Sequence, residues 1–435
     1  MAWKDAPILM SVSERTPTGK VGDENKMAFR LAAHLFGGQL TVAICAFLVN
    51  LLSSRVMGPS GRGELAFYLQ VSYVLGVIGL AGLDRAYPAR AALRNTLAVG
   101  SSEFRRLVKP SLIMALLSAA TIALALDNGS VGALVVAAAL ALVTFGNCLT
   151  GGLRAVCTVA SSGRSFLTTS LAAQISLASI ATGLSLAGEK STATWLGAYA
   201  ICITVPPTIF LWAIKADKSK TAERNPTSLR RIRRLGLALM PSSLASIIAT
   251  RSDRIMLPWM ASYQQLGLYV VVATVCEMAQ WPLQAWIDAH APAWHRAFIA
   301  GNLRPFRKMC HVAVLAVPAS AAVYLGCRFA VLPLFGDAYS AAANLILPLS
   351  AASALLILSR CALGLAVAMG SSTSPLISDT CAMVVAVTAY VLMIPSMGAL
   401  GAAWGSLLSY CTAAVVSISL CAIHGRRAHS RFVSS

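Results

Sequence analysis

The apolar stretch at 235–258 carries ionisable side chains of a kind that bind anions or form ion pairs. Asp253 and Arg254 are adjacent near its end, and Arg251 lies one turn before Arg254. If the stretch crosses a membrane, each charge costs at least about 2.5 kcal/mol at the bilayer centre, so these groups should face protein or a water-filled cavity. Hydroxyl residues at helical spacing extend the same polar face: Ser243, Ser246 and Thr250.

Glu277 occupies the middle of the next apolar stretch, 265–287. An unpaired carboxylate in that position is costly, so it should either protonate or pair with an arginine. Asp253 and Glu277 are therefore candidates for one of two roles: proton coupling, or a fixed ion pair that holds neighbouring helices together. Pro241 and Pro282 should break their helices locally and free carbonyl groups, which are tolerable only against protein or a cavity.

Further arginines recur within apolar stretches or at their ends and could face one central space. Guanidinium groups stay charged and bind phosphate oxygens in bidentate fashion, so a ladder of them could follow an anionic group across a membrane. The alternatives are that Arg254 pairs with Asp253 or another helix, and that Arg30 and Arg85 extend to the membrane interface. The candidate cavity cations are Arg30, Arg55, Arg85, Arg251, Arg254 and Arg360.

The composition places these residues in a membrane protein. The 435-residue chain is 57% hydrophobic and 12% charged, with a mean hydropathy of +0.71, far outside the soluble range. We therefore expect an all-α, polytopic transmembrane bundle of about twelve helices. The expected spans are 31–54, 65–83, 110–126, 131–150, 165–187, 192–213, 235–258, 265–287, 311–333, 341–363, 375–395 and 399–423.

The distribution of Lys and Arg predicts the orientation. With both termini in the cytoplasm, 28 of the 35 basic residues fall in the tails and inner loops, and three, Arg251, Arg254 and Arg360, fall within expected spans. Those on the opposite side are Arg55, Arg62, Lys190 and Arg328. The +19 net charge thus indicates topology and contact with anionic membrane lipids, not nucleic acid. The expected division is an N-terminal tail (1–30), an N-lobe (31–213), a basic linker (214–234), a C-lobe (235–423) and a C-terminal tail (424–435).

An internal repeat supports two pseudo-symmetric six-helix lobes. Residues 55–59 (RVMGP) and 65–68 (LAFY) match residues 254–258 (RIMLP) and 266–269 (LGLY). Both copies run outward, which is typical of a parallel repeat about an axis along the membrane normal, as in many secondary transporters. The path of a substrate would then lie between the lobes and be lined by spans 1, 2, 7 and 8.

The sequence gives no indication of a cofactor, a metal or enzyme chemistry. The 11 cysteines are scattered singly, without a CxxC pair or a His/Cys cluster of metal-ligand spacing. Nucleophile-elbow, phosphate-loop and paired-carboxylate patterns are absent as well. We expect no cofactor, no bound metal and no catalytic residue.

Five segments resemble polysaccharide-exporting flippases of the Wzx type, within the multidrug/oligosaccharidyl-lipid/polysaccharide (MOP) superfamily. The segments are 54–66 (SRVMGPSGRGELA), 79–86 (GLAGLDRA), 252–257 (SDRIML), 266–282 and 394–404 (IPSMGALGAAW). The resemblance implies a V-shaped fold like that of multidrug and toxin extrusion (MATE) transporters.

The resemblance also implies a function. The substrate would be an undecaprenyl-pyrophosphate-linked oligosaccharide, moved across the bacterial plasma (inner) membrane for lipopolysaccharide O-antigen, exopolysaccharide or capsule synthesis. Polysaccharide polymerase and export machinery would be further partners. Some relatives carry two extra C-terminal helices beyond span 12; we expect no lipid-binding groove made from such helices here.

Other functions remain open at this stage. A multidrug exporter of the same fold would prefer organic cations and would need acidic and aromatic lining. A polysaccharide polymerase or ligase generally needs a large outer loop, whereas the expected outer loops are short. A scramblase-like or scaffold role without selective transport is a further alternative.

Arg254→Ala should abolish export of the lipid-linked oligosaccharide while the protein still inserts into the membrane. Arg254→Lys should keep part of the activity, because a lysine retains the charge but not the bidentate geometry. Surface polysaccharide and membrane protein level, measured together, check this expectation. Unimpaired export in the alanine variant would remove Arg254 from the proposed site.

Overall fold

The computed structural model describes residues 21–90, 97–126, 131–160, 162–214, 226–278, 280–371 and 373–433, and the regular structure in these ranges is entirely helical. The helices are α1 (Val21–Leu80), α2 (Leu83–Arg90), α3 (Leu97–Leu126), α4 (Val131–Val159), α5 (Gly163–Leu186), α6 (Thr192–Ala213), α8 (Pro226–Met260), α9 (Tyr263–Met278), α10 (Trp281–Ile299), α11 (Pro305–Gly326), α12 (Leu332–Phe335), α13 (Ile346–Ala368), α14 (Ser374–Met397) and α15 (Ala399–Val433), with a π-helix η1 at Cys327–Val331 and a 3-10 helix η2 at Asp337–Leu345.

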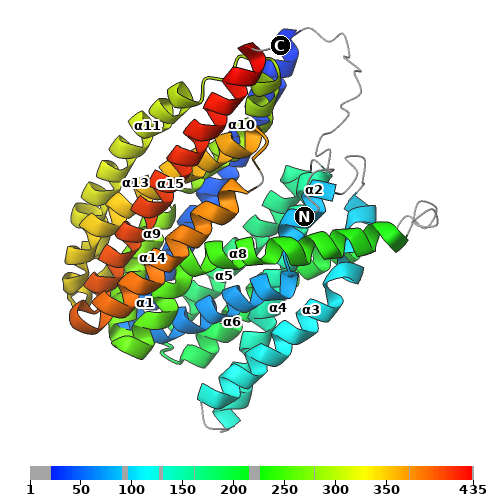
Figure 1. Ribbon diagram of the computed structural model, residues 1–435. Coiled ribbons are helices and arrows are strands. Elements are labelled where there is room, and N and C mark those ends of the chain that lie inside the picture. Colours follow the sequence, from blue (N-terminus) through cyan, green and yellow to red (C-terminus); the bar gives the residue numbers. More distant parts are fainter. Residues whose placement is uncertain are drawn as a thin grey trace.

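The predicted all-α transmembrane bundle is confirmed. In the described residues, 10 helices are long and apolar enough to cross a membrane. One of them, α1, accounts for two predicted spans because it changes direction at Gly58 (Figure 1). The predicted span 265–287 corresponds to α9 and α10, which are separate helices. All twelve predicted spans therefore have a helical counterpart.

The kink in α1 follows from its Gly58–Pro59 pair. Gly58 has φ 69° and ψ −179°, a conformation that strains residues with a β-carbon. Pro59 has no amide hydrogen to donate to the preceding turn, and its ring hinders helical continuation on that side. The two residues thus separate the first and second transmembrane segments without a loop.

Two helix boundaries differ from the prediction in ways that matter for function. The span expected at 131–150 continues as α4 to Val159, which places Arg154 on a helix. The basic linker expected at 214–234 is helical from Pro226, where α8 begins. Residues 1–20 of the predicted N-terminal tail, 215–225 of the linker and 434–435 of the C-terminal tail lie outside the described residues.

The two halves of the chain pack their helices in the same pattern. In the first half α3 contacts α4, and α6 contacts both α4 and α5. In the second half α11 contacts α13, and α15 contacts both α13 and α14. The contact of α1 with α5 likewise corresponds to that of α8 with α14. Figure 1 shows the two groups meeting at the lower left and diverging toward the upper right. We refer to them as the N-lobe (α1–α6) and the C-lobe (α8–α15).

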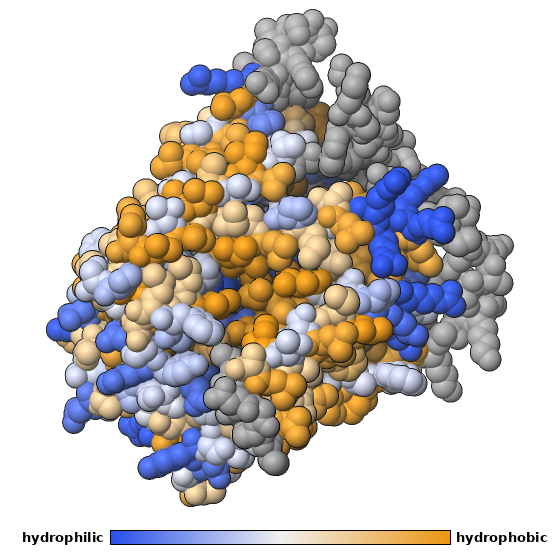
Figure 2. Space-filling model, turned by 60° about the horizontal axis from the view of Figure 1, so that its bottom comes forward, coloured by the Kyte–Doolittle hydropathy of each residue, from blue (hydrophilic) through white to orange (hydrophobic). Residues whose placement is uncertain are grey.

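The outer surface is apolar where lipid would contact it. Large hydrophobic side chains are exposed along α3 and α11, and in Figure 2 hydrophobic residues form a broad area between hydrophilic side chains at two ends of the molecule. So much exposed apolar surface is unfavourable in water but not in contact with the hydrocarbon of a membrane. Examples are Ile113, Met114, Leu117, Val314, Leu315 and Val317.

The lobes meet where the second part of α1 crosses α9. A β-carbon added to Gly63 would overlap the carbonyl oxygen of Tyr263, and one added to Gly267 would overlap that of Pro59. The backbones are thus in direct contact at both glycines. Phe67 packs edge-on against Trp259 and Tyr263 beside this crossing. This crossing closes the molecule at one end.

Gly63→Val should destabilise the protein, because an isopropyl group cannot fit between the backbones of α1 and α9. We expect a loss of about 2 kcal/mol or more, typical of overpacking, seen as a lower melting temperature in detergent. Gly197→Val is the matched control, since nothing lies within 4 Å of a β-carbon at Gly197 in α6. Equal melting temperatures for the two variants would contradict the assigned crossing.

Candidate functional site

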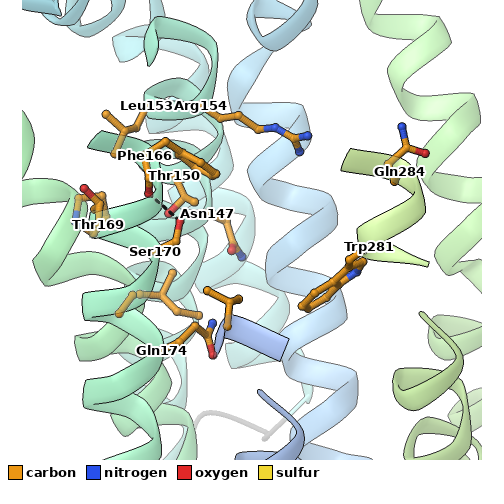
Figure 3. Close-up of a pocket in the computed structure, with 14 residues that line it drawn as sticks. Asn147, Thr150, Leu153, Arg154, Phe166, Thr169, Ser170, Gln174, Trp281 and Gln284 are labelled. Atoms are coloured by element: carbon orange, nitrogen blue, oxygen red, sulfur yellow. Dashed lines mark hydrogen bonds between the residues drawn. The ribbon is translucent and has the colours of Figure 1, made fainter. Parts of the chain in front are cut away.

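Two adjoining cavities lie beside α4, with volumes of about 410 and 550 Å³. Residues of both lobes line the first, and N-lobe residues line the second. Both are lined by Asn147, Thr150, Arg154 and Phe166, so they form one continuous space beside α4. Figure 3 shows Arg154 on the N-lobe side, with Trp281 and Gln284 of α10 across the space. We call this space the central cavity.

The central cavity begins a short way along α1 from the crossing with α9. Its residues on α2 and on the second part of α1 run from Tyr73 to Asp84, beyond Gly63 and Phe67. At the far end it reaches Arg154, near the end of α4, and Phe166, near the start of α5. The cavity therefore faces the end of the bundle opposite to the α1–α9 crossing.

A polar stripe on α4 supplies much of the lining. Asn147, Thr150, Arg154 and Thr158 follow one another at spacings of three, four and four residues, which places them on one helical face. Arg154 and Thr158 are exposed, whereas Leu153 and Val156 beside them are buried in the lobe. The apolar face of α4 therefore packs into the N-lobe and turns Arg154 toward the cavity.

Sequence reasoning missed Arg154 because the predicted span ended at residue 150 and left the arginine in an inner loop. The spacing of Asn147, Thr150, Arg154 and Thr158 was the available signal. The predicted path along spans 1, 2, 7 and 8 also differs from the described lining. Spans 1, 2 and 8 contribute Val42, Tyr73 and Trp281, and most other lining residues come from α4, α5 and α6.

The lining is rich in neutral hydrogen-bonding groups. The 410 Å³ part combines amides and hydroxyls with the ring of Trp281, and its one ionisable lining side chain is that of Arg154. The 550 Å³ part adds Asp84 and Tyr73. Amides and hydroxyls donate and accept, so they suit ligands with many hydroxyl groups. The polar lining of the first part comprises Asn147, Thr150, Arg154, Thr169, Ser170, Gln174 and Gln284.

Glu277 pairs with two of the predicted cavity cations. Arg251 Nη1 donates to both carboxylate oxygens at 2.9 Å, and Arg254 Nη2 donates to Oε1. Arg254 is 3% exposed, whereas the side chains of Arg251 and Glu277 are each 25% exposed. The three groups fasten α8 to α9. Arg251 also lies 5.6 Å from the ring centroid of Tyr73, which lines the central cavity.

Asp253 borders the same small buried cavity as Glu277 but has its own set of hydrogen bonds. Its Oδ1 accepts from the backbone amide of Arg254 at 2.8 Å, and its Oδ2 accepts from the Tyr269 hydroxyl at 2.5 Å. The Tyr269 and Tyr390 hydroxyls both lie within 3.0 Å of Ser406 Oγ. Asp253 is 2% exposed. The network joins α8, α9, α14 and α15.

The other predicted cations lie elsewhere along the interface. Arg85 Nη1 donates to Ser242 at 2.7 Å, and Arg360 Nη2 donates to Ser246 at 3.2 Å. Arg360 also pairs with Asp379 at 3.6 Å. These side chains therefore lie beside the middle of α8, one to three turns before the residues that pair with Glu277.

Two predicted cations lie outside both groups. Arg55 Nε donates to the carbonyl of Leu334 at 2.6 Å, at the opposite end of the molecule from the start of α8. Arg30 lies on the first part of α1, outside the residues whose side chains the structure describes. The six predicted cations thus occupy several places, and the structure brings two of them, Arg251 and Arg254, to one carboxylate.

Comparison with solved structures identifies the fold. The lipid II flippase MurJ, in an inward closed conformation, matches with a TM-score of 0.64 and 10% identity over 88% of this chain and 87% of that chain. An inward-facing multidrug resistance MATE transporter of the MOP superfamily matches with a TM-score of 0.61 and 14% identity, over 91% of this chain and 95% of that chain. A eukaryotic MATE transporter matches with a TM-score of 0.58 and 14% identity, over 93% of this chain and 99% of that chain.

No protein-family model matches the sequence, and no curated protein matches it. At 10 to 14% identity the structural likeness shows the fold alone. The predicted MATE-like architecture is therefore confirmed, whereas the Wzx branch stays a prediction.

Glu277→Gln should destabilise the protein more than Arg254→Gln does. The first change leaves two cations in the membrane without a counter-charge, whereas the second leaves Glu277 paired with Arg251. We expect a loss of about 3 kcal/mol for Glu277→Gln, as when one partner of a buried pair is removed. The free energy of unfolding, measured in detergent, gives both values.

The double variant tests whether Arg254 and Glu277 act on each other. We expect a coupling free energy of about 1 to 2 kcal/mol between the two substitutions. Arg328→Gln is the control, because Arg328 is exposed at the end of the bundle and should change stability little. Strictly additive effects of the two substitutions would show that the ion pair does not fasten α8 to α9.

Proposed function

We propose that this protein moves an undecaprenyl-pyrophosphate-linked oligosaccharide across the bacterial inner membrane by alternating access. The observation that carries the proposal is the lining of the central cavity, where Arg154 lies among amides and hydroxyls facing Trp281. A lipid-linked glycan has an anionic pyrophosphate and many hydroxyl groups, which match these two kinds of lining.

Each part of such a substrate has a counterpart in the described residues. Arg154 is an exposed cation in the cavity and would bind phosphate oxygens. Asn147, Gln174 and Gln284 would exchange hydrogen bonds with sugar hydroxyls. Trp281 offers a flat apolar surface to the CH groups of a sugar ring. The lipid tail would remain in the bilayer, beside the exposed apolar helices.

The arrangement of the lobes supports alternating access. The lobes are in backbone contact at the α1–α9 crossing, and the central cavity faces the other end. Rocking the lobes about this interface would open the crossing and close the cavity end. An inward-facing and an outward-facing MATE transporter both share this fold, with TM-scores of 0.61 and 0.59, which supports a motion between two such states.

The orientation follows from the positive charges. The described start of α1 and the end of α15 lie at the same end of the bundle (Figure 1). We assign this end to the cytoplasm, because the arginines at the start of α8 would bind anionic lipid there. Both termini would then be cytoplasmic, and the division into two tails, two lobes and a basic linker is part of the same proposal. The arginines at the start of α8 are Arg230, Arg231, Arg233 and Arg234.

Within this proposal Arg251 and Arg254 stabilise the packing of α8 against α9 and also lie near the cavity. Arg251 borders the cavity at Tyr73 and could reach the pyrophosphate as the lobes move. Glu277 would then lose part of its counter-charge and take up a proton, which would couple the conformational change to a proton gradient. Polymerase and export machinery would consume the glycan on the outer side.

A multidrug exporter of organic cations is the alternative that shares this fold. Such an exporter needs acidic and aromatic lining. The central cavity has aromatic rings, but the described lining of its 410 Å³ part contains one cation and no carboxylate, and that of its 550 Å³ part contains a single carboxylate, Asp84. The connection between α8 and α9 at the outer end is two residues long, which offers no room for the large catalytic loop of a polymerase. These features favour the glycan flippase.

Arg154→Gln and Trp281→Ala should each reduce export at least tenfold, because one removes the cavity cation and the other removes the stacking surface. The gene is deleted in its host and complemented with each variant. Undecaprenyl-linked oligosaccharide and surface polysaccharide are then quantified together. Precursor should accumulate as surface polymer disappears, with membrane protein levels unchanged.

Arg164→Gln is the matched control, because Arg164 is an exposed arginine near the start of α5 that does not line the cavity. It should restore export fully. An unchanged precursor pool in the deletion strain, together with altered sensitivity to cationic drugs, would favour the multidrug exporter instead. Full export by both cavity variants would refute the assigned binding site.

A further inference from the structure

A buried arginine at the kink of α1 has no acidic partner. Arg62 is 5% exposed and lies four residues beyond Gly58. Its Nε and Nη2 donate to Asn50 Oδ1 at 3.1 and 2.9 Å, whereas its Nη1 has no hydrogen-bond partner. An amide oxygen carries only a partial negative charge, so the guanidinium charge is not neutralised by Asn50.

The groups that act electrostatically on Arg62 include no carboxylate. They are the hydroxyl groups of Tyr199 and Tyr339 and a second cation, Arg254. The carboxylates in this part of the described chain are engaged elsewhere. Glu64 accepts from Thr192 at 2.7 Å, and Glu277 pairs with Arg251 and Arg254.

Two more buried donors near Arg62 lack acceptors. Asn50 Nδ2 and Ser54 Oγ have no hydrogen-bond partner, and the two residues are 2% and 0% exposed. They are four residues apart on one face of α1. With Arg62 Nη1 they give three unsatisfied groups in one buried region. Leaving buried donors and a buried charge unsatisfied costs several kcal/mol, so the region is suited to a ligand that accepts hydrogen bonds and is negative.

The geometry points to a binding site for a small anion, the size of chloride, beside Arg62, Asn50 and Ser54. Water could accept hydrogen bonds from these groups but would not neutralise the guanidinium. A monatomic anion fits better than a polyatomic one, because all three side chains are almost completely buried.

The position of the site indicates what the anion would do. The Tyr339 hydroxyl of η2, in the C-lobe, donates to the carbonyl of Ser54 in the N-lobe at 3.1 Å. The site therefore lies where the two lobes meet, near the α1–α9 crossing. A bound anion would neutralise Arg62 there and stabilise the closed outer end.

The test compares halides with an anion too large to enter. The full-length protein is purified in detergent and melted in sodium gluconate, sodium chloride or sodium bromide at equal ionic strength, with tryptophan fluorescence as the signal. Chloride and bromide should raise the melting temperature by about 2 °C or more over gluconate, in a saturable way. Melting at the same temperature in all three salts would overturn the proposal.

Asn50→Asp is the decisive variant. A carboxylate at this position would meet the guanidinium in the geometry that Asn50 already has and would replace the anion as counter-charge. The variant should melt in gluconate at least as high as the unmodified protein in chloride, and halides should no longer raise its melting temperature. A halide response equal to that of the unmodified protein would refute the site.

Two further variants complete the test. Ser54→Ala removes one donor and should raise the half-maximal halide concentration about tenfold; it decides the question if Asn50→Asp does not fold. Arg55→Gln is the matched control, because Arg55 lies on the same segment but is exposed and bonded to a backbone carbonyl. It should keep the full halide response, and its loss would show that the effect is not specific to Arg62.

Discussion

Glu277 has two arginine partners because a charge inside a membrane helix needs a counter-charge within reach. Neither water nor lipid tails can supply one at that depth, so the partner must come from another part of the protein. Here the partners, Arg251 and Arg254, come from α8, and the two ion pairs fix how α8 crosses α9. The orientation of α9 in turn determines where its backbone meets α1 and where α10 places Trp281. The same requirement for satisfied charge thus positions the closed end and the cavity.

This requirement also sorts the arginines by role. Arg254 is buried and paired, so it contributes to the packing of the C-lobe. Arg154 is exposed to the central cavity, where a ligand can reach it. Arg62 is buried beside an amide in place of a carboxylate, which indicates a counter-ion from solution. Three arginines with the same side-chain chemistry therefore differ in function because their surroundings supply different amounts of negative charge.

The sequence predicted the positions of the helices better than the partners of their charged side chains. Hydropathy located the spans because each must bury about 20 apolar residues in lipid, and the repeat around Pro59 and Pro258 predicted the two lobes. Pairing depends on which helices become neighbours, so it could not be read from one helix. The sequence left open whether Arg254 faces the cavity or pairs with adjacent Asp253 or with another helix. In the structure Arg254 reaches Glu277 of α9, while Asp253 turns to Tyr269.

Arg154 shows why the end of a membrane helix is hard to predict from sequence. Its helix was cut short because a charged residue lowers the local hydropathy, although a charge that faces a wet cavity does not end a helix. The polar stripe on α4 and the apolar exterior of α3 each match the surroundings of the helix, and these surroundings differ. α3 presents its large apolar side chains to lipid, whereas α4 is shielded from lipid on its polar face by α1, α5 and α10. A helix in such a position can carry an arginine because its environment is polar. Whether a charge on a helix destabilises the protein or can bind a ligand therefore depends on where the helix lies relative to the cavity.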